Sequence, residues 1–212
     1  FFEDAITSSR ELELTLTGKM CGLEERAPMC GVPHHAVDTY LNRLVSKGYK
    51  VAICEQVEDA KNAKGLVKRE VTRVVTPGTN LNACALDEGK NNYIMSIVYL
   101  SDRYGLAIAD VTTGDFYTTE VDSDRKLLDE ISKFAPSEIV CNEAFYVSGV
   151  DLEDLRHRLN IAISSLESWY FDDEMCKRTL SEHFHAATME GLGLKDFPCG
   201  VVSSGALLKY LL

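Results

Sequence analysis

The sequence predicts an α/β protein made of two domains, and three observations support this fold class. Apolar residues recur with helical spacing in some segments and with strand-like alternation in others. A polar stretch without periodicity, residues 77–91, separates two such sets of segments. The 212 residues, 45% of them hydrophobic, are enough to bury a core in each of two modest domains. We therefore expect a first domain at 1–76, a linker at 77–91 and a second domain at 92–212.

The first domain is expected to be α+β with a mixed sheet. Residues 1–14 predict a helix, TLTG at 15–18 predicts a strand or turn, and repeated Gly and Pro predict a long loop over 18–34. The next segment has apolar residues at helical spacing, which predicts a helix with one buried face that ends at Gly48. The residues of that face are Val37, Tyr40, Leu41, Leu44 and Val45.

Two strands are expected to complete the first domain. Residues 50–56 predict a buried strand, and the alternation in residues 67–75 predicts a half-exposed one. Strict alternation would place every odd-numbered side chain of the second strand on one face. That face would then mix arginines with valines: Val67, Arg69, Val71, Arg73 and Val75.

The second domain opens with three strand-like runs joined by short turns, and helices and strands alternate after them. The strands are expected at 93–100, 104–113, 116–121, 137–141 and 160–166, and the helices at 123–134, 151–159, 172–185 and 198–212. This βββαβαβα order is that of an RNase H-like sheet. Enzymes with this sheet hold metal ions on paired carboxylates, but the first strand here has no acid. Asp110 therefore lacks a partner, and we expect it to be a strand-end or turn residue of a protein without a catalytic site.

Other catalytic and metal-binding patterns give little support for an enzyme. The chain has no phosphate-binding GxxxxGK[ST], no GxSxG and no HExxH. Zinc ligation by Cys21, Cys30, His34 and His35 fits poorly, because adjacent histidines seldom point at one ion. We expect no metal and no cofactor in this chain.

Cysteine use and hydropathy indicate the compartment. The seven cysteines include no CxxC, so we expect reduced and mostly buried thiols. No apolar run approaches the roughly 20 residues of a membrane span, and the first residues lack the basic lead of a secretory signal. The expected location is the cytoplasm.

The net charge of −11 hides an uneven distribution. Acidic and basic residues balance over 1–80, and the whole acidic excess lies in 81–212. Within the neutral part, residues 61–73 carry five basic side chains against Glu70: Lys61, Lys64, Lys68, Arg69 and Arg73. A local cationic stripe attracts a phosphate backbone whatever the charge beyond a Debye length of about 10 Å. The alternative is an ordinary solvated strand and loop.

The segment PMCGVPHHAVD allows a second phosphate contact. The first N–H groups of a helix have no partner within the helix and carry partial positive charge, so a loop with Gly31, Pro33, His34 and His35 could bring a phosphate against them. In the alternative interpretation, Gly and Pro only shape the loop and a histidine caps the helix.

Several of these motifs together resemble the amino-terminal region of the MutS family of bacterial DNA mismatch repair proteins. The first-domain motifs are TLTGK at 15–19, APMCGVPHHAVDTYLNRLV at 27–45, VAICEQVED at 51–59 and GLVKREVTRVVTPGT at 65–79. ADVTTGDFYTTE, SEIV and CGVVSSGALLKYL resemble the next domain of that family. The resemblance covers essentially the whole chain and implies a mismatch-recognition domain followed by an RNase H-like connector domain.

The resemblance also implies roles for individual residues. Contacts to the backbone of double-stranded DNA with mismatches or small loops fall on Lys19, Gly31, Val32, Pro33, His34 and Arg69. Arg73 joins them from the strand-face argument above. The connector would relay the DNA-bound state and present a surface to the partner protein MutL, for which we take the helix at 172–185, with Arg178 and Thr179.

The resemblance implies further parts that this chain lacks. ATP and magnesium would bind a carboxyl-terminal ATPase region, and the full-length protein would act as a homodimer in the bacterial cytoplasm, at the nucleoid when bound to DNA. The family's Phe-x-Glu motif stacks a ring on the mispaired base, but Phe1-Phe2-Glu3 has these letters in the wrong register, so we do not assign it the wedge role and expect the true wedge to be cut off or unseen. We expect the chain alone to be a monomeric, non-catalytic binding module. A protein-interaction module without DNA contact, or a relative acting in recombination, remains the alternative.

Overall fold

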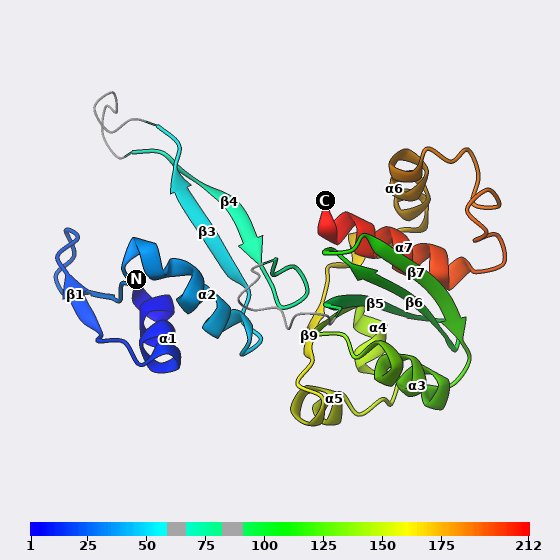
Figure 1. The fold of residues 1–212 in the computed structure, drawn as a ribbon, viewed down its shortest axis with the longest axis horizontal. Coiled ribbons are helices and arrows are strands. Elements are labelled where there is room, and N and C mark those ends of the chain that lie inside the picture. The colour runs from blue at the N-terminus through cyan, green and yellow to red at the C-terminus, as the bar shows by residue number, and fades with distance from the viewer. Residues whose placement is uncertain (59–66, 82–90) are drawn as a thin grey trace. The chain divides into compact units, whose positions relative to one another are not determined.

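The computed structural model describes residues 1–58, 67–81 and 91–212 and divides into two compact units, Phe1–Ala85 and Leu86–Leu212 (Figure 1). Each unit has its own hydrophobic clusters. Within the described ranges, no helix is long and apolar enough to cross a membrane.

The first unit combines two helices with two separate antiparallel strand pairs, β1 with β2 and β3 with β4. Its elements are α1 (Phe2–Leu12), β1 (Thr17–Lys19), β2 (Ala27–Met29), the 3₁₀ turn η1 (His34–Ala36), α2 (Val37–Val45), β3 (Val51–Gln56) and β4 (Arg69–Val75). Strand β2 lies inside the segment predicted to be a loop. Its Pro28 cannot donate to a ladder, but an edge strand tolerates this, because one side of such a strand has no neighbour.

Helix α2 organises the core of the first unit. Leu41 and Val45 are buried against Val75, and Val51 and Ile53 pack around them. The predicted face is therefore confirmed at its centre, whereas Tyr40 and Leu44 are half-buried and Val37 is 41% exposed. The end of the helix is also confirmed: Gly48 has φ 86° and donates its N–H to the carbonyl of Val45 at 2.9 Å.

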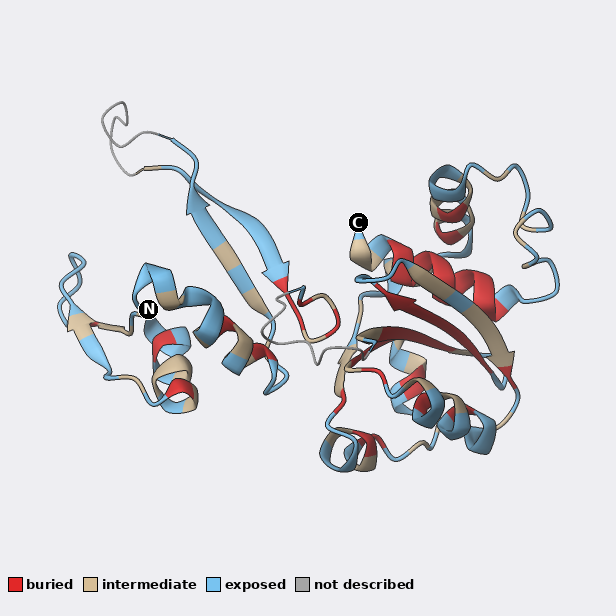
Figure 2. Cartoon of the chain, in the orientation of Figure 1, coloured by how far each residue is buried: buried red, intermediate tan, exposed pale blue. Residues whose placement is uncertain are grey.

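The strand at β3 is not buried as predicted. Only Val51 and Ile53 are partly covered, and the other residues of the strand, Cys54 among them, are exposed (Figure 2). A two-stranded ribbon covers one face at most with α2, so every second residue of an apolar run stays in solvent.

The second unit is built on one five-stranded sheet of order β7-β6-β5-β8-β9. Strands β5 (Tyr93–Leu100), β6 (Arg103–Asp110) and β7 (Asp115–Val121) form an antiparallel meander, and β8 (Glu138–Cys141) and β9 (Ala162–Ser165) add in parallel beside β5. This is the strand order expected of an RNase H-like sheet, and it confirms the predicted α/β class.

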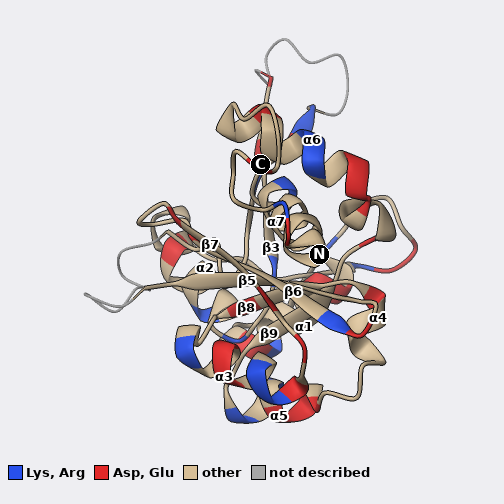
Figure 3. Cartoon of the chain, turned by 90° about the vertical axis from the view of Figure 1, so that its right-hand side faces the viewer, with Lys and Arg blue, Asp and Glu red and all other residues tan. Residues whose placement is uncertain are grey.

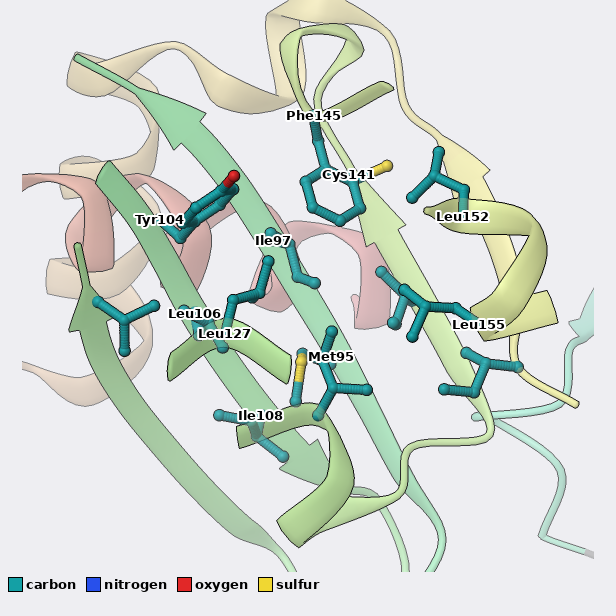
Figure 4. Packing of buried hydrophobic residues seen from close by; sticks show 14 residues of the cluster. Met95, Ile97, Tyr104, Leu106, Ile108, Leu127, Cys141, Phe145, Leu152 and Leu155 are labelled. Atoms are coloured by element: carbon teal, nitrogen blue, oxygen red, sulfur yellow. The ribbon is translucent and has the colours of Figure 1, made fainter. Parts of the chain in front are cut away.

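Helices cover both faces of this sheet (Figure 1). They are α3 (Asp124–Phe134), α4 (Glu143–Tyr146), α5 (Leu152–Arg158), the 3₁₀ turn η2 (Ser168–Phe171), α6 (Asp173–Phe184) and α7 (Pro198–Leu211). Met95 and Ile97 lie in the cluster with α3, α4 and α5 (Figure 4), while Ile94 lies in the cluster with Leu207 of α7. Burial on both faces explains why β5 is apolar at consecutive positions.

Small residues let α7 approach its neighbours closely. A side chain on Gly105 of β6 would lie 2.2 Å from the carbonyl oxygen of Cys199, and one on Gly205 would lie 2.3 Å from Cβ of Cys176. Helix α7 is therefore packed between the sheet on one side and α6 on the other, and ten of its fourteen residues are buried.

The cysteines of the two units differ in how far they are buried. Cys141, Cys176 and Cys199 are buried in the second unit, whereas Cys21 and Cys54 are exposed and Cys30 is intermediate. Among the described cysteines, the prediction of mostly buried thiols is therefore right only for the second unit, and Cys84 lies outside the described residues. Burial raises the pKa of Cys141 and of Cys176 to about 12, which keeps both thiols protonated.

Candidate nucleic-acid interface

The corner between β2 and α2 brings the loop residues of the first unit to the surface. Gly31, Pro33 and His34 are exposed and Val32 is half-buried. Pro33 precedes η1 with φ −60° and ψ 137° and accepts the N–H of Ala36 at 2.9 Å. No described side chain caps η1 or α2, so the alternative in which a histidine caps the helix is wrong. The corner is the exposed amino end of a helical segment, with the geometry that suits an anion.

Neither the backbone conformation nor the packing of the described chain requires a glycine at Gly31. A side chain built at this position meets nothing within 4 Å, and its φ is not positive. Gly22, by contrast, has φ 81°, which a residue with a side chain rarely adopts. Gly31 therefore leaves open space in front of its backbone, where another molecule can approach.

Lys19 is connected to this corner through the β1–β2 pair. Thr17 lies opposite Met29, and its hydroxyl donates to the Met29 carbonyl at 2.9 Å, one residue before Cys30. Lys19 lies two residues further along β1, opposite Ala27, at a rise of about 7 Å from the Thr17 position. The structure therefore places Lys19 on the strand pair that leads into the corner.

The two arginines of β4 do not share a face, contrary to the prediction. Arg73 pairs with Ile53 and Val71 pairs with Cys54, so Thr72 is an extra residue in a β-bulge. Directly paired residues share a face of the ribbon, and the bulge shifts the alternation by one. Arg73 therefore shares the face of Ile53, which packs toward α2, while Arg69 pairs with Gln56 on the opposite face.

Ion pairing separates the basic residues of the first unit into two groups. Lys47 pairs with Glu11 at 3.2 Å, and hydrogen bonds from Lys47 and then Arg10 hold the pKa of that carboxyl below its ordinary value. Lys68 pairs with Glu70 at 2.5 Å. In the part of the chain that the structure describes, a second group of exposed basic residues forms no ion pair: Lys19, Arg26, Arg43, Arg69 and Arg73. Lys61 and Lys64 lie outside the described residues.

Most of the described basic residues of the second unit lie in local ion pairs with carboxylates. Figure 3 shows basic and acidic residues side by side on α3 and α5, for example Arg158 with Asp154 at 2.8 Å. On α6, Lys177 pairs with Asp173 at 2.5 Å, Arg178 is exposed, and the hydroxyl of Thr179 donates to the Met175 carbonyl at 2.9 Å. Of the two α6 residues chosen from the sequence, Arg178 is the one with a side chain open to a partner.

Sequence reasoning missed an apolar pocket beside α6. Its volume is about 370 Å³, and it lies between β7, α6 and the segment that leads to α7. The lining residues are Phe116, Thr118, Leu180, Phe184, Leu192, Gly193, Leu194 and Phe197. The signal that the sequence offered is an aromatic residue, Phe184, near the end of a predicted helix.

Asp110 is the buried last residue of β6, which confirms its assignment to a strand end. Its carboxylate accepts hydrogen bonds from Asn92 and Thr112. Among the residues that the structure describes there is no group of three or more metal-ligating side chains.

Comparison with known proteins matches both units. Residues 1–83 match the family model described as MutS domain I, and residues 92–212 match the model described as MutS domain II. Similar curated proteins are the DNA mismatch repair protein MutS of Lachnoclostridium phytofermentans (60% identical over 211 residues), of Ruminiclostridium cellulolyticum (52% over 214) and of Acetivibrio thermocellus (51% over 214). Each alignment covers 100% of this chain but only 23% or 24% of the relative, so the chain spans about a quarter of the length of these proteins.

Proposed function

The chain belongs to the MutS family, and from this premise we propose that its first unit binds the backbone of double-stranded DNA that contains mismatches or small loops. The relatives are named as DNA mismatch repair proteins, which supports this substrate. The observation that carries the proposal is the exposed corner at Gly31 together with basic side chains that no described carboxylate neutralises.

The proposed contacts position DNA and do not read its sequence. Lys19, Arg69 and Arg73 supply charge, while Gly31, Val32, Pro33 and His34 form the surface against which the backbone lies. Contacts of this kind suit a protein that tests the deformability of any duplex. Because the bulge separates the two arginines, we rank Arg69 above Arg73 as a contact.

Arg69→Ala tests the charge contribution. The variant should bind a duplex more weakly and lower the slope of log affinity against log salt by about 1, because one phosphate contact is lost. Fluorescence anisotropy with matched and mismatched duplexes over a salt series measures both quantities. The matched control is Lys68→Ala, since Lys68 is adjacent and exposed but already paired with Glu70. Equal binding by the two variants would contradict the proposal and favour a protein-interaction module without DNA contact.

Gly31→Val tests the corner separately from charge. The added Cβ lies more than 4 Å from every other atom of the described chain, so the melting temperature should stay within about 2 °C of the wild type while duplex affinity falls. Unchanged affinity would show that no backbone approaches Gly31.

For the second unit we propose a connector role between the DNA-bound state and other regions of the full-length protein. The partner MutL would contact α6 at Arg178 and Thr179, and ATP with magnesium would bind a region outside this chain, in a cytoplasmic homodimer. The exposure of Arg178 and its place on α6 support the first of these points. Loss of MutL capture by the full-length Arg178→Glu variant, with duplex binding intact, is the expected result.

A further inference from the structure

Asp110 occupies the end of the central antiparallel pair of the second unit. It is 1% exposed, and it lies opposite Tyr93, the first residue of β5. On its other side it lies opposite Asp115, the first residue of β7. The side chain is therefore buried at the point where the chain enters the sheet from the segment before residue 92.

Both oxygens of the Asp110 carboxylate are used by backbone or side-chain donors. Oδ2 accepts the backbone N–H of Asn92 at 3.1 Å. Oδ1 accepts the backbone N–H of Thr112 at 2.8 Å and its hydroxyl at 2.6 Å. One carboxylate thus links the incoming chain at Asn92 to the turn between β6 and β7.

A second tie holds Asn92 from the other side. The hydroxyl of Ser137, which precedes β8, donates to the side-chain oxygen of Asn92 and to the carbonyl of Tyr93, the latter at 3.2 Å. The backbone N–H of Ser137 also donates to the Tyr93 carbonyl at 2.9 Å. The start of β5 is therefore bound to the two strands that flank it, β6 through Asp110 and β8 through Ser137.

We propose that Asp110 is a positioning residue that fixes the entry of the chain into the second unit, so that a displacement of the preceding chain is transmitted to the central strand β5. An acid near this end of an RNase H-like sheet could serve a metal ion. Here its acceptor positions are taken by the Asn92 amide, by two groups of Thr112 and by the Asn91 side chain. The inference does not depend on DNA binding by the first unit.

The hydrogen-bond pattern shows why an acid is needed. The Asn92 amide and both Thr112 groups that face the carboxylate are donors, the Asn91 side chain also hydrogen-bonds it, and a carboxylate accepts on both oxygens. In Asp110→Asn the amide oxygen can still accept from Thr112, which offers two donors. The amide NH₂ then faces the N–H of Asn92, and two donors cannot bond to each other. The substitution therefore releases the entry selectively and keeps the turn.

Amide hydrogen exchange of this chain tests the first part of the proposal. In Asp110→Asn the Asn92 amide should exchange about tenfold faster or more relative to the Thr112 amide, because it loses a hydrogen bond to a charged acceptor. Thr112→Val removes only the hydroxyl and should leave this ratio within about twofold. Ser137→Ala, which removes the other tie, should also raise the exchange of Asn92, and it provides a second variant if Asp110→Asn does not fold.

A distance measurement tests whether the entry restrains the chain between the units. Spin labels go on the exposed Cys54 and on Val147→Cys, which replaces a residue 82% exposed, after Cys21, Cys30 and Cys84 have been changed to Ser. The distribution of distances should be broader in Asp110→Asn than in the wild type. Ser204→Ala is the control, because it removes a 2.7 Å bond to Thr118 elsewhere in the same unit and should not broaden it.

The two measurements together decide the proposal. A purely structural role would lower the stability of Asp110→Asn and Ser204→Ala alike without a selective change at Asn92. An unchanged ratio of Asn92 to Thr112 exchange, or a distance distribution as narrow as that of the wild type, would overturn the inference.

Discussion

The strands of the two units bury their residues very differently. In the second unit, all residues of β6 except Arg103 are buried, whereas in the first unit only Val75 of β4 is buried. The sheet of the second unit has helices on both faces, and each ribbon of the first unit has two strands only. The second unit thus uses its strands to build a core, while the first unit leaves basic and apolar strand residues at the surface, where a ligand can contact them.

Truncation of a strand residue in each unit should give the largest difference. Ile97 of β5 has an exposed fraction of 0%, and Val71 of β4 is 60% exposed. Ile97→Ala should lower the free energy of unfolding by about 2–5 kcal/mol, because it leaves a cavity in a two-sided core. Val71→Ala should change it by no more than about 0.5 kcal/mol. Chemical denaturation of both variants measures this, and similar losses would mean that the units do not differ as the burial indicates.

Added volume at a glycine should give the next largest difference. Gly105→Ala pushes Cβ against the Cys199 carbonyl and should cost about 1–3 kcal/mol, because α7 must move away from the sheet. Gly31→Ala, in the first unit, should have almost no effect on stability. Thermal unfolding followed by circular dichroism compares the two, and a tolerated Gly105→Ala would show that α7 is less tightly packed than described.

Lowering the pH should change the stability of the second unit by less than these substitutions do, through the carboxyl of Asp110. Burial alone would raise the pKa of Asp110, but hydrogen bonds from Thr112 and then Asn92 outweigh it, so the pKa lies below its ordinary value. A carboxyl with a lowered folded pKa contributes stability that is present above its unfolded pKa of about 3.9 and is lost as the pH falls through the folded pKa. The stability difference between the wild type and Asp110→Asn should therefore be largest near pH 7 and shrink below about pH 4. A difference that is constant with pH would mean that the pKa of the Asp110 carboxyl is the same in the folded and unfolded states.

Much of the fold could be predicted because its signals are local. The helical spacing of Leu41 and Val45 and the alternating runs of the second unit depend only on neighbouring residues. The missed elements lack such signals. Strand β2 has three residues with a proline at the centre, and α4 has four residues, which is too short for a period to be visible. Both exist because the rest of the unit holds them, β2 by pairing with β1 and α4 by the buried Phe145.

The candidate site was predictable in composition but not in arrangement. The exposure of Gly31 and Arg69 follows from a loop and a polar strand position, which the sequence indicates directly. The prediction that Arg73 shares a face with Arg69 was wrong, because the bulge at Thr72 depends on how β4 pairs with β3. Only part of the role of Asp110 could be predicted. Its position at a strand end follows from the local pattern, but its hydrogen bond to Asn92 joins residues 18 apart in the sequence, which no local pattern indicates.

The sequence by itself determined the family of this protein, the order of most of its secondary structure and the types of residue at its candidate interface. These depend on motifs and periodicities that each short segment carries on its own. Only the tertiary structure decided which face each arginine of β4 occupies, how closely α7 lies on the sheet and what Asp110 bonds to. These are properties of pairing between segments, where a shift of one residue changes every contact and leaves the local pattern unchanged.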